Sequence, residues 1–373
     1  MSLPDITVPA DLLPVDGRFG CGPSKIRQEA VEALSAAAPA LLGTSHRRPA
    51  VKDQVRRVRE GLDVFFGLPA GYEVLLGNGG ATLFWDAAAH HLIERRSAHA
   101  VFGEFSTKFA RAVAGTPWLE EPVVVESPPG THPVLEPVEG VDAYALTHCE
   151  TSTGVAMPVR RPDPGGDALV LVDATSAAGG IAFDPVDADA YYFSPQKCFA
   201  SEGGLWAALC SPAALDRVAA IAASGRHAPA TLDLTVARDN AASDQTYNTP
   251  AVATLFLMAE QLDWMNSQGG IAWAAQSCLA KSSHLYGWAQ SRDWAAPFVA
   301  DPAQRSPVVC TVDLDDGVAA DIVTGILRRH GVVDIEAYRK LGRNQLRIAT
   351  FPAIDHADVE ALTACVDHVV GRL

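Results

Sequence analysis

Short apolar runs alternate with amphipathic segments along the first 210 residues of the chain. Mostly apolar runs, which are typical of buried strands, occupy residues 72–76, 98–102, 122–126, 141–147, 168–172, 190–193 and 205–210. Between them, segments such as 51–66 carry apolar residues at helical spacing with charges in between. Apolar strands separated by helices predict an α/β fold, in which helices cover both faces of a mainly parallel sheet.

The pattern changes after Gly269-Gly270. A long amphipathic segment is followed by shorter apolar runs and helical patterns at 308–314, 317–329, 332–336, 345–350 and 357–372. This order predicts a small C-terminal α+β domain at 271–373. It follows a large domain at 1–270, of which residues 1–23 form a proline-rich N-terminal arm. A chain of 373 residues is long for one hydrophobic core, which also favours two domains.

The chain is acidic, with a formal net charge of −15. Nucleic acids and anionic membranes are bound by basic surfaces, so this charge argues against both as partners. It also makes any basic cluster informative. A helix is expected from Lys25 to about Ala38, capped by Ser24, and the loop after it carries His46-Arg47-Arg48. This loop is either a solvated basic segment or an anion site, for which arginine offers a two-pronged fork.

The chain has seven cysteines, which is an odd number, and no C-x-x-C motif. This argues against a disulfide framework and against a zinc ribbon, so we expect reduced, buried thiols and no metal site. The N-terminus lacks the pattern of a secretory signal, and no apolar run approaches the roughly 20 residues of a membrane span. These features predict a cytoplasmic protein.

Polar residues recur where the expected strands end, namely Asn78, Thr151, Asp173 and Lys197. Such ends meet at one edge of a parallel sheet, where ligands bind. Lys197 is the one lysine that follows an apolar strand. A buried lysine tends to lose its proton, and a neutral amine suits Schiff-base chemistry with a carbonyl group. The alternative is a lysine whose stem is buried and whose charge reaches solvent.

The turn Gly77–Thr82 lies between a strand and a helix, where backbone N–H groups bind anions. It matches neither G-x-G-x-x-G nor a P-loop. Together with Lys197, the carboxylate of Asp173, the ring of Phe105 and the hydroxyl of Thr151, this turn suits pyridoxal 5'-phosphate (PLP). That cofactor needs an amine for its aldehyde, an acidic partner for its ring nitrogen, donors for its phosphate and a face for its ring.

Several motifs follow one another along the whole chain. They are FGCGPSK at 19–25, GTSHR at 43–47, GNGGAT at 77–82, ETSTG at 150–154, VDATS at 172–176, YFSPQK at 192–197, QTYNTP at 245–250 and YRKLGRNQLR at 338–347. In this combination the chain resembles the phosphoserine aminotransferases, and is most similar to their actinobacterial branch. These are PLP-dependent aminotransferases of class V and fold type I, with a large domain built on a mainly parallel sheet and a smaller C-terminal domain.

The resemblance implies a set of cofactor contacts. Lys197 would hold the cofactor as an imine and carry the transferred proton, and Asp173 would pair with the ring nitrogen. Phe105 would stack on the ring, and Thr151 would bond near its phenolic oxygen. The cofactor phosphate would be bound by Gly80, Ala81 and Gln196, with Asn248 and Thr249 added by a second subunit. Two positions depart from the family pattern: Ala81 replaces a common basic residue, and Cys149 replaces a common asparagine.

The resemblance also implies the substrates and their contacts. Arg347 would hold the substrate α-carboxylate. The distal anion would face His46 and Arg47 of the second subunit, helped by Arg339 and Lys340. The enzyme would be a homodimer with shared active sites that transfers the amino group of L-glutamate to 3-phosphohydroxypyruvate. The products, 2-oxoglutarate and O-phospho-L-serine, belong to L-serine biosynthesis, and pyridoxine biosynthesis is a related role.

Three alternatives remain at this stage. Another class V enzyme, of the alanine–glyoxylate or serine–pyruvate aminotransferase type, would share Lys197 and Asp173 but would need no site for a substrate phosphate. A cysteine desulfurase is disfavoured because Gln196 stands where those enzymes have histidine. A dinucleotide-binding oxidoreductase would instead use the turn Gly77–Thr82.

Overall fold

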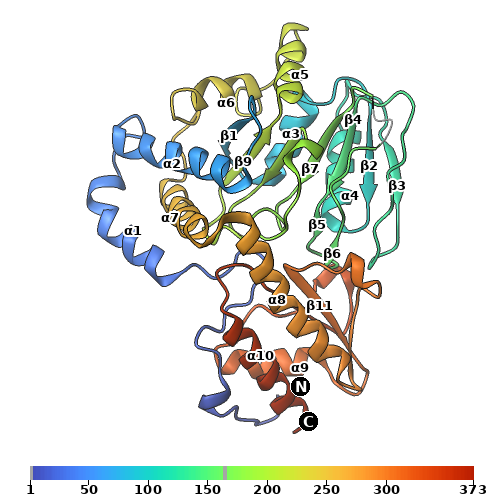
Figure 1. Ribbon diagram of the computed structural model, residues 1–373. Coiled ribbons are helices and arrows are strands. Elements are labelled where there is room, and N and C mark those ends of the chain that lie inside the picture. Colours follow the sequence, from blue (N-terminus) through green and yellow to red (C-terminus); the bar gives the residue numbers. More distant parts are fainter. Residues whose placement is uncertain (1–2, 163–165) are drawn as a thin grey trace.

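The computed structural model describes residues 3–162 and 166–373, and a seven-stranded sheet forms its centre (Figure 1). The strands follow the order β1-β9-β8-β7-β4-β2-β3, and β9 alone runs antiparallel to its neighbours. Their bounds are β1 (Glu73–Asn78), β2 (Ser97–Val101), β3 (Val123–Glu126), β4 (Ala143–Thr147), β7 (Leu169–Asp173), β8 (Ala190–Phe193) and β9 (Leu205–Cys210). The predicted mainly parallel sheet is therefore confirmed.

Different helices cover the two faces of this sheet, because alternate residues of a strand point to opposite sides. Within β7, Val170 and Val172 belong to the same hydrophobic cluster as α2 and α7, whereas Leu169 and Leu171 belong to that of α3, α4, α5 and α6. The bounds of these helices are α2 (Pro49–Phe66), α3 (Ala81–His91), α4 (Glu104–Ala114), α5 (Pro212–Ala223), α6 (Leu234–Ala241) and α7 (Val252–Gln268). A strand buried on both faces reads as a continuous apolar run, which is why the sequence reveals these strands so clearly.

A second, antiparallel sheet forms near the C-terminus from β10 (Ala295–Pro297), β11 (Val309–Leu314) and β12 (Gln345–Ala349). It packs with α8 (Gly270–Gln290), α9 (Ala320–Arg329) and α10 (His356–Val370) in one hydrophobic cluster. The expected strand at 332–336 is wrong: this segment makes only isolated bridges, at Val333 and Glu336. Asp334 between them has a φ of 64°, which an extended strand does not permit.

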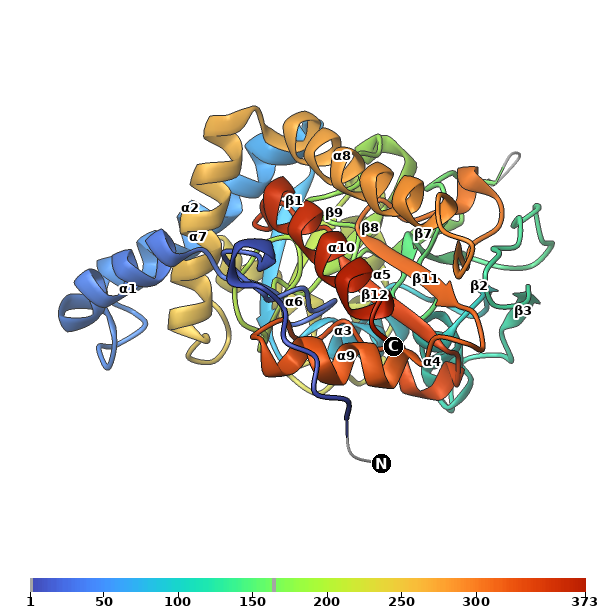
Figure 2. The same cartoon turned by 90° about the horizontal axis from the view of Figure 1, so that it is seen from below.

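The N-terminal arm packs against this second sheet and its helices (Figure 2). Phe19 shares their hydrophobic cluster, and its carbonyl accepts a hydrogen bond from the N–H of Ala349 in β12 at 3.0 Å. The carbonyl of Gly17 accepts from the N–H of Val333 at 2.8 Å. The division of the chain at residue 270 stays a prediction, but the arm lies with the C-terminal elements in space.

The first long helix, α1 (Gln28–Leu41), extends away from the body in both views (Figures 1 and 2). It begins three residues later than expected, and Ser24 does not cap it. Short elements complete the fold: η1 (Ala10–Leu12), β5 (Cys149–Glu150), β6 (Val155–Ala156), η2 (Pro185–Asp187), η3 (Pro302–Gln304) and η4 (Arg339–Leu341). Among the described residues, no helix has the length and apolar character needed to cross a membrane.

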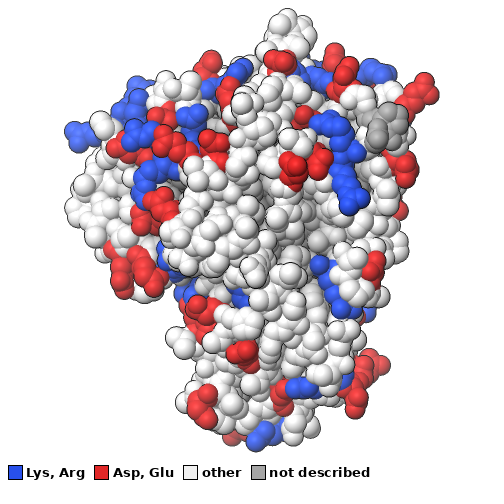
Figure 3. All heavy atoms as spheres, in the orientation of Figure 1, with Lys and Arg blue, Asp and Glu red and all other residues white. Residues whose placement is uncertain are grey.

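Acidic and basic side chains are interspersed on the face drawn in Figure 3, which carries no broad basic surface. The basic residues that matter for an anionic ligand must therefore be sought as local groups. Lys197 and Arg347, which line one cavity, are such a pair.

Candidate active site

A cavity of about 400 Å³ lies at the carboxyl ends of the central parallel strands. Thr151, Asp173 and Lys197 line it, so three of the four strand-end residues share this site. Asn78 does not line it and instead donates a hydrogen bond to the carbonyl of Thr249 at 3.0 Å. Its remaining walls include Cys21, Gly22, Gly79, Gly80, Ala81, Thr82, Trp85, Phe105, Cys149, Thr175, Gln196, Tyr338 and Arg347.

Lys197 is buried in the wall of this cavity, four residues after the end of β8. Its Nζ donates to Thr151 Oγ1 at 2.8 Å and to Ser176 Oγ at 2.6 Å, and these two hydroxyls also contact each other. The pKa of Lys197 is lowered, chiefly because burial penalises the charged amine. A lysine that snorkels to solvent would be neither buried nor held by two hydroxyls. The structure thus favours the reactive-amine interpretation of Lys197.

Asp173 is the last residue of β7 and is also buried. Its Oδ1 accepts hydrogen bonds from the N–H and the hydroxyl of Thr175, at 3.0 and 2.7 Å. Its Oδ2 accepts from the indole Nε1 of Trp85 at 3.0 Å. Every one of these partners is a donor, so the network suits an ionised carboxylate, which only accepts. The carboxylate is fixed in orientation and can pair with a cationic ligand atom in the cavity.

The glycine turn brings the start of α3 to the cavity wall. Gly79 and Gly80 have φ values of 108° and 78°, which residues other than glycine rarely adopt. Ala81 and Thr82 open the helix and line the cavity, and the first N–H groups of a helix lack intrahelical partners. Nearby, Gln196 lines the cavity, and its side-chain amide nitrogen is a donor from which an anion can accept. This part of the cavity suits a phosphate group.

The ring of Phe105 faces the amine of Lys197, with its centroid 5.5 Å from Nζ. It lies in the first turn of α4, where the buried carboxylate of Glu150 accepts from the N–H groups of Phe105 and Ser106 at 3.1 and 3.0 Å. An acidic group at a helix N-terminus is stabilised by the helix dipole. Glu150 therefore holds the end of α4, and with it the ring of Phe105, in place.

Arg347 enters the cavity from β12 of the second sheet. Its Nη1 donates to the carbonyl of Thr151 at 3.3 Å, while its buried Nε has no partner within the described chain. The guanidinium carbon lies 5.4 Å from the ring centroid of Tyr338, and that ring lies 6.3 Å from Phe105. The guanidinium is oriented but keeps donor capacity for an anionic ligand.

Several candidate residues lie outside this cavity. His46 and Arg47 follow α1 in an outer loop, and His46 Nδ1 lies 3.0 Å from Thr249 Oγ1. Asn248 lines a different pocket, together with residues of β1 and α6. The structure therefore brings the loop of His46 against the segment of Thr249, 203 residues further along the chain. Neither residue lines the cavity that holds Lys197 of the same chain.

The remaining two candidates, Arg339 and Lys340, are exposed in η4. Lys340 forms an ion pair with Glu104 at the start of α4 and lines a neighbouring cavity of about 350 Å³ that shares Tyr338. They lie at the edge of the main cavity and not within it.

Sequence reasoning missed Trp85, Ser176, Tyr338 and Gly22, each of which lines the cavity or bonds to Lys197. Ser176 could have been predicted from the sequence, because it is the last residue of the VDATS motif, three residues after Asp173. Trp85 lies one turn into α3, where an indole reads as ordinary core. Its role becomes visible only when β7 and α3 are packed together.

Comparison with known proteins decides between the remaining alternatives. The model of the family Aminotransferase class-V matches residues 138–337. A putative phosphoserine aminotransferase of Mycobacterium avium is 59% identical over 374 residues, covering 100% of both chains. The phosphoserine aminotransferase of a Nocardioides species is 58% identical over 370 residues, covering 99% of both chains. This chain belongs to the class V phosphoserine aminotransferases.

A solved phosphoserine aminotransferase, that of Cytophaga hutchinsonii, has the same fold, with a TM-score of 0.86. It is 25% identical and the match covers 95% of this chain and 99% of that one. Membership of the phosphoserine aminotransferases excludes the dinucleotide-binding oxidoreductase. It also makes the cavity around Lys197 the candidate active site of an aminotransferase.

Proposed function

We propose that this phosphoserine aminotransferase uses PLP to transfer the amino group of L-glutamate to 3-phosphohydroxypyruvate, in the synthesis of O-phospho-L-serine. The observation that carries the proposal is the buried, doubly hydrogen-bonded Lys197, with its lowered pKa, in one cavity with the ring of Phe105 and the carboxylate of Asp173. The sequence identity of the whole chain to named phosphoserine aminotransferases supports the substrate.

The residues of the cavity fit PLP group by group. Lys197 offers an amine for the aldehyde, and Asp173 offers a fixed carboxylate for the ring nitrogen. The N–H groups at the start of α3 and the side-chain amide nitrogen of Gln196 offer donors for the phosphate. Phe105 offers a ring face. Many family members have a basic residue at the position of Ala81. Without it, backbone N–H groups of the turn would contribute more of the phosphate binding.

When bound, PLP supplies an electron sink that stabilises negative charge at the substrate α-carbon. Asp173 would favour a positive charge on the ring nitrogen, because three donors fix the orientation of its carboxylate. Lys197 Nζ would act as the base that takes a proton from the substrate α-carbon and returns it to the former aldehyde carbon of the cofactor, two atoms further on. Its burial favours the neutral amine, which is the form that can accept a proton.

Thr151 links the amine to the substrate site. Its Oγ1 accepts a hydrogen bond from Lys197, and its carbonyl accepts one from Arg347. Arg347 would bind the α-carboxylate that both substrates carry, in the two-pronged geometry that guanidinium and carboxylate share. One residue therefore sets the relative positions of the proton carrier and the carboxylate clamp.

We further propose a homodimer with shared active sites. His46 and Thr249, which lie 3.0 Å apart on the outside of their own chain, would together enter the cavity of a second copy. Arg47 and Asn248 would come with them, so that Arg47 faces the substrate phosphate and Asn248 the cofactor phosphate. A cytoplasmic location is proposed as well, since all seven cysteines are buried and free, as a reducing compartment allows.

Acceptor preference tests the proposed substrate. We expect a kcat/KM with 3-phosphohydroxypyruvate far above that with glyoxylate, pyruvate or hydroxypyruvate. Arg47→Ala should lower the value for the phosphorylated acceptor by about 10²-fold, because a charge-assisted bond to phosphate is lost, and should spare the others. Arg48→Ala, in the same loop, is the matched control. Equal losses for all acceptors, or a preference for glyoxylate, would favour the alanine–glyoxylate type instead.

A further inference from the structure

The motif FGCGPSK at 19–25 has no part in the function proposed above, yet it lies against Lys197. A Cβ added at Gly22 would stand 2.7 Å from Cε of Lys197, so the backbone there packs directly on the lysine side chain. The hydroxyl of Ser24 donates to the carbonyl of Lys197 at 2.9 Å. Cys21 and Gly22 also line the cavity. The motif thus forms a wall of the site and supports Lys197 from one side.

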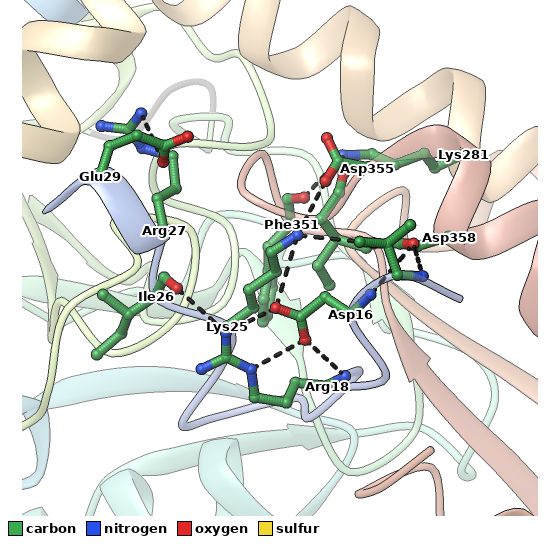
Figure 4. Close-up of polar contacts among 12 residues, drawn as sticks. Asp16, Arg18, Lys25, Ile26, Arg27, Glu29, Lys281, Phe351, Asp355 and Asp358 are labelled. Carbon is green, nitrogen blue, oxygen red and sulfur yellow. Dashed lines mark hydrogen bonds and ion pairs between the residues drawn. The ribbon is translucent and has the colours of Figure 1, made fainter. Parts of the chain in front are cut away.

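The loop that carries this motif is closed at its base (Figure 4). Arg18 donates from Nε and Nη2 to the two carboxylate oxygens of Asp16, at 2.9 and 2.6 Å, and from Nη2 to the carbonyl of Ile26 at 3.4 Å. Both ends of the loop are therefore tied to one guanidinium. We call residues 15–26 the strap.

Lys25 fastens the strap to the start of α10. Its Nζ lies 2.9 Å from Asp355 Oδ2, 3.6 Å from Asp358 Oδ2 and 3.8 Å from Asp16 Oδ2 (Figure 4). Asp358 is buried, and its Oδ1 also accepts from the N–H of Val15 at 2.7 Å. Breaking a buried ion pair on one side leaves an uncompensated charge, which is strongly unfavourable. Removal of Lys25 would therefore drive Asp358 towards water and loosen the strap.

The start of α10, to which Lys25 is bound, is itself held by buried hydrogen bonds from α8. Lys281 of α8 is buried and donates to the carbonyls of Phe351 and Ile354, at 2.7 and 2.8 Å. These carbonyls form the corner between β12 and α10, directly before Asp355 (Figure 4). A continuous set of contacts thus runs from α8 through Lys25 and the strap to Lys197.

We propose that the strap positions the side chain of Lys197 and keeps water from it, and that Lys25 is the positioning residue that fastens the strap to α10. The proposal rests on the proposed function, in which Lys197 reacts with PLP. It adds a role for a residue that touches neither substrate nor cofactor.

The strap should affect the ionisation of Lys197, because burial is the main cause of its lowered pKa. The groups that face its amine are Cys149 of β5, Asp173 of β7, Cys21 of the strap and Arg347 of β12. If the strap moves away, water reaches the amine, and its pKa rises towards the usual value of about 10.4. The neutral fraction at a given pH then falls.

The experiment compares the full-length wild-type protein with Lys25→Met and a control, Arg292→Met. Arg292 pairs with Asp367 of α10 at 2.5 Å, so the control also loses an ion pair to α10 but leaves the strap contacts intact. Two quantities are measured for each. One is the rate at which the cofactor-free protein takes up PLP, as a function of pH. The other is hydrogen exchange of the amides in residues 15–26, with the melting temperature recorded alongside.

We expect Lys25→Met to raise the pH midpoint of the uptake rate by about half a unit or more, and to speed exchange in the strap by about tenfold or more. Arg292→Met should lower the melting temperature and leave both quantities at their wild-type values. Faster exchange in Lys25→Met with an unchanged midpoint overturns the proposal, and so does an equal shift in the control.

A second variant covers the case in which Lys25→Met does not fold. Ser24→Ala removes the bond to the carbonyl of Lys197 but keeps the ion pairs of Lys25. An upward shift of its midpoint supports the proposal, and a wild-type midpoint overturns it. Failure of the wild-type protein to take up PLP would contradict the proposed function itself. Normal uptake, with the same pH midpoint in the wild type and the strap variants, would contradict only the proposed role of the strap.

Discussion

The indole Nε1 of Trp85 donates a hydrogen bond to Oδ2 of Asp173, at 3.0 Å, inside the wall of the active-site cavity. Thr175 supplies two further donors to Oδ1. The carboxylate that would pair with the cofactor ring nitrogen is therefore held on both oxygens, and among the described residues Trp85 is its hydrogen-bond partner from a distant part of the sequence. Trp85 of α3 thereby helps to fix the orientation of the Asp173 carboxylate at the end of β7.

Replacement of Trp85 by phenylalanine should weaken PLP binding. The variant removes one hydrogen bond to a charged group, which contributes about 1.5–3 kcal/mol, so we expect the dissociation constant of PLP to rise about tenfold or more. Titration of the cofactor-free protein measures it. Trp206→Phe is the matched control, because the buried Nε1 of Trp206 has no partner within the described chain. Equal affinity in the two variants would show that the Trp85 bond is immaterial.

Arg347→Gln should impair both half-reactions alike, because L-glutamate and 3-phosphohydroxypyruvate both carry an α-carboxylate. We expect kcat/KM to fall about 10²-fold or more for each substrate, as when one partner of a buried charge pair is removed. Arg343→Gln is the control, since Arg343 pairs with Asp313 and lies over the ring of Phe298, and it does not line the cavity. A loss confined to one substrate would contradict a clamp for the shared carboxylate.

The lowered pKa of Lys197 predicts a pH dependence of stability in the cofactor-free protein. Between the folded pKa and the unfolded value of about 10.4, the unfolded chain binds more protons, so stability from this group rises with pH. Lys197→Met lacks this dependence. We expect the variant to melt above the wild type at neutral pH, with the difference shrinking as pH approaches 10.4. A difference that stays constant from neutral to alkaline pH would mean that the pKa of Lys197 is not lowered.

Shared active sites predict recovery of activity in mixed dimers. Towards 3-phosphohydroxypyruvate, Lys197→Met alone would be inactive, and Arg47→Ala alone would keep only about a hundredth of the wild-type activity. After exchange of subunits, half of the dimers are mixed and each holds one intact site, so about a quarter of the wild-type activity should return. If Arg47 serves the site of its own chain, each mixed dimer has two damaged sites and no activity returns. The assay of an equimolar mixture after dissociation and reassociation distinguishes these cases.

The fold was largely accessible from the sequence, because strands covered on both faces must be apolar at every position. The run that becomes β7 is an example, with Leu169 and Leu171 on one face and Val170 and Val172 on the other. Where local preference and tertiary contacts disagree, sequence reasoning failed. Residues 332–336 look like a strand, but Asp334 adopts a positive φ and the segment lies between the strap and β12.

The site was accessible only where its residues lie in one segment or follow a strand. Asp173 and Lys197 could be placed by strand ends alone. Ser24 looked like a helix cap, yet its hydroxyl reaches the carbonyl of Lys197, 173 residues away. The contact of His46 with Thr249 and that of Trp85 with Asp173 likewise join distant segments. Such pairs depend on the packing of whole elements, which no local pattern of residues encodes.

The central claim is that Lys197 and its cavity carry an amino group from L-glutamate to 3-phosphohydroxypyruvate. The most direct measurement follows the visible spectrum of the PLP-loaded protein in single turnover. We predict that L-glutamate alone removes the absorbance of the lysine-bound cofactor, that 3-phosphohydroxypyruvate then restores it with release of O-phospho-L-serine, and that Lys197→Met shows neither change. A wild-type protein whose spectrum does not respond to glutamate, or is restored by glyoxylate but not by the phosphorylated acceptor, would contradict the account.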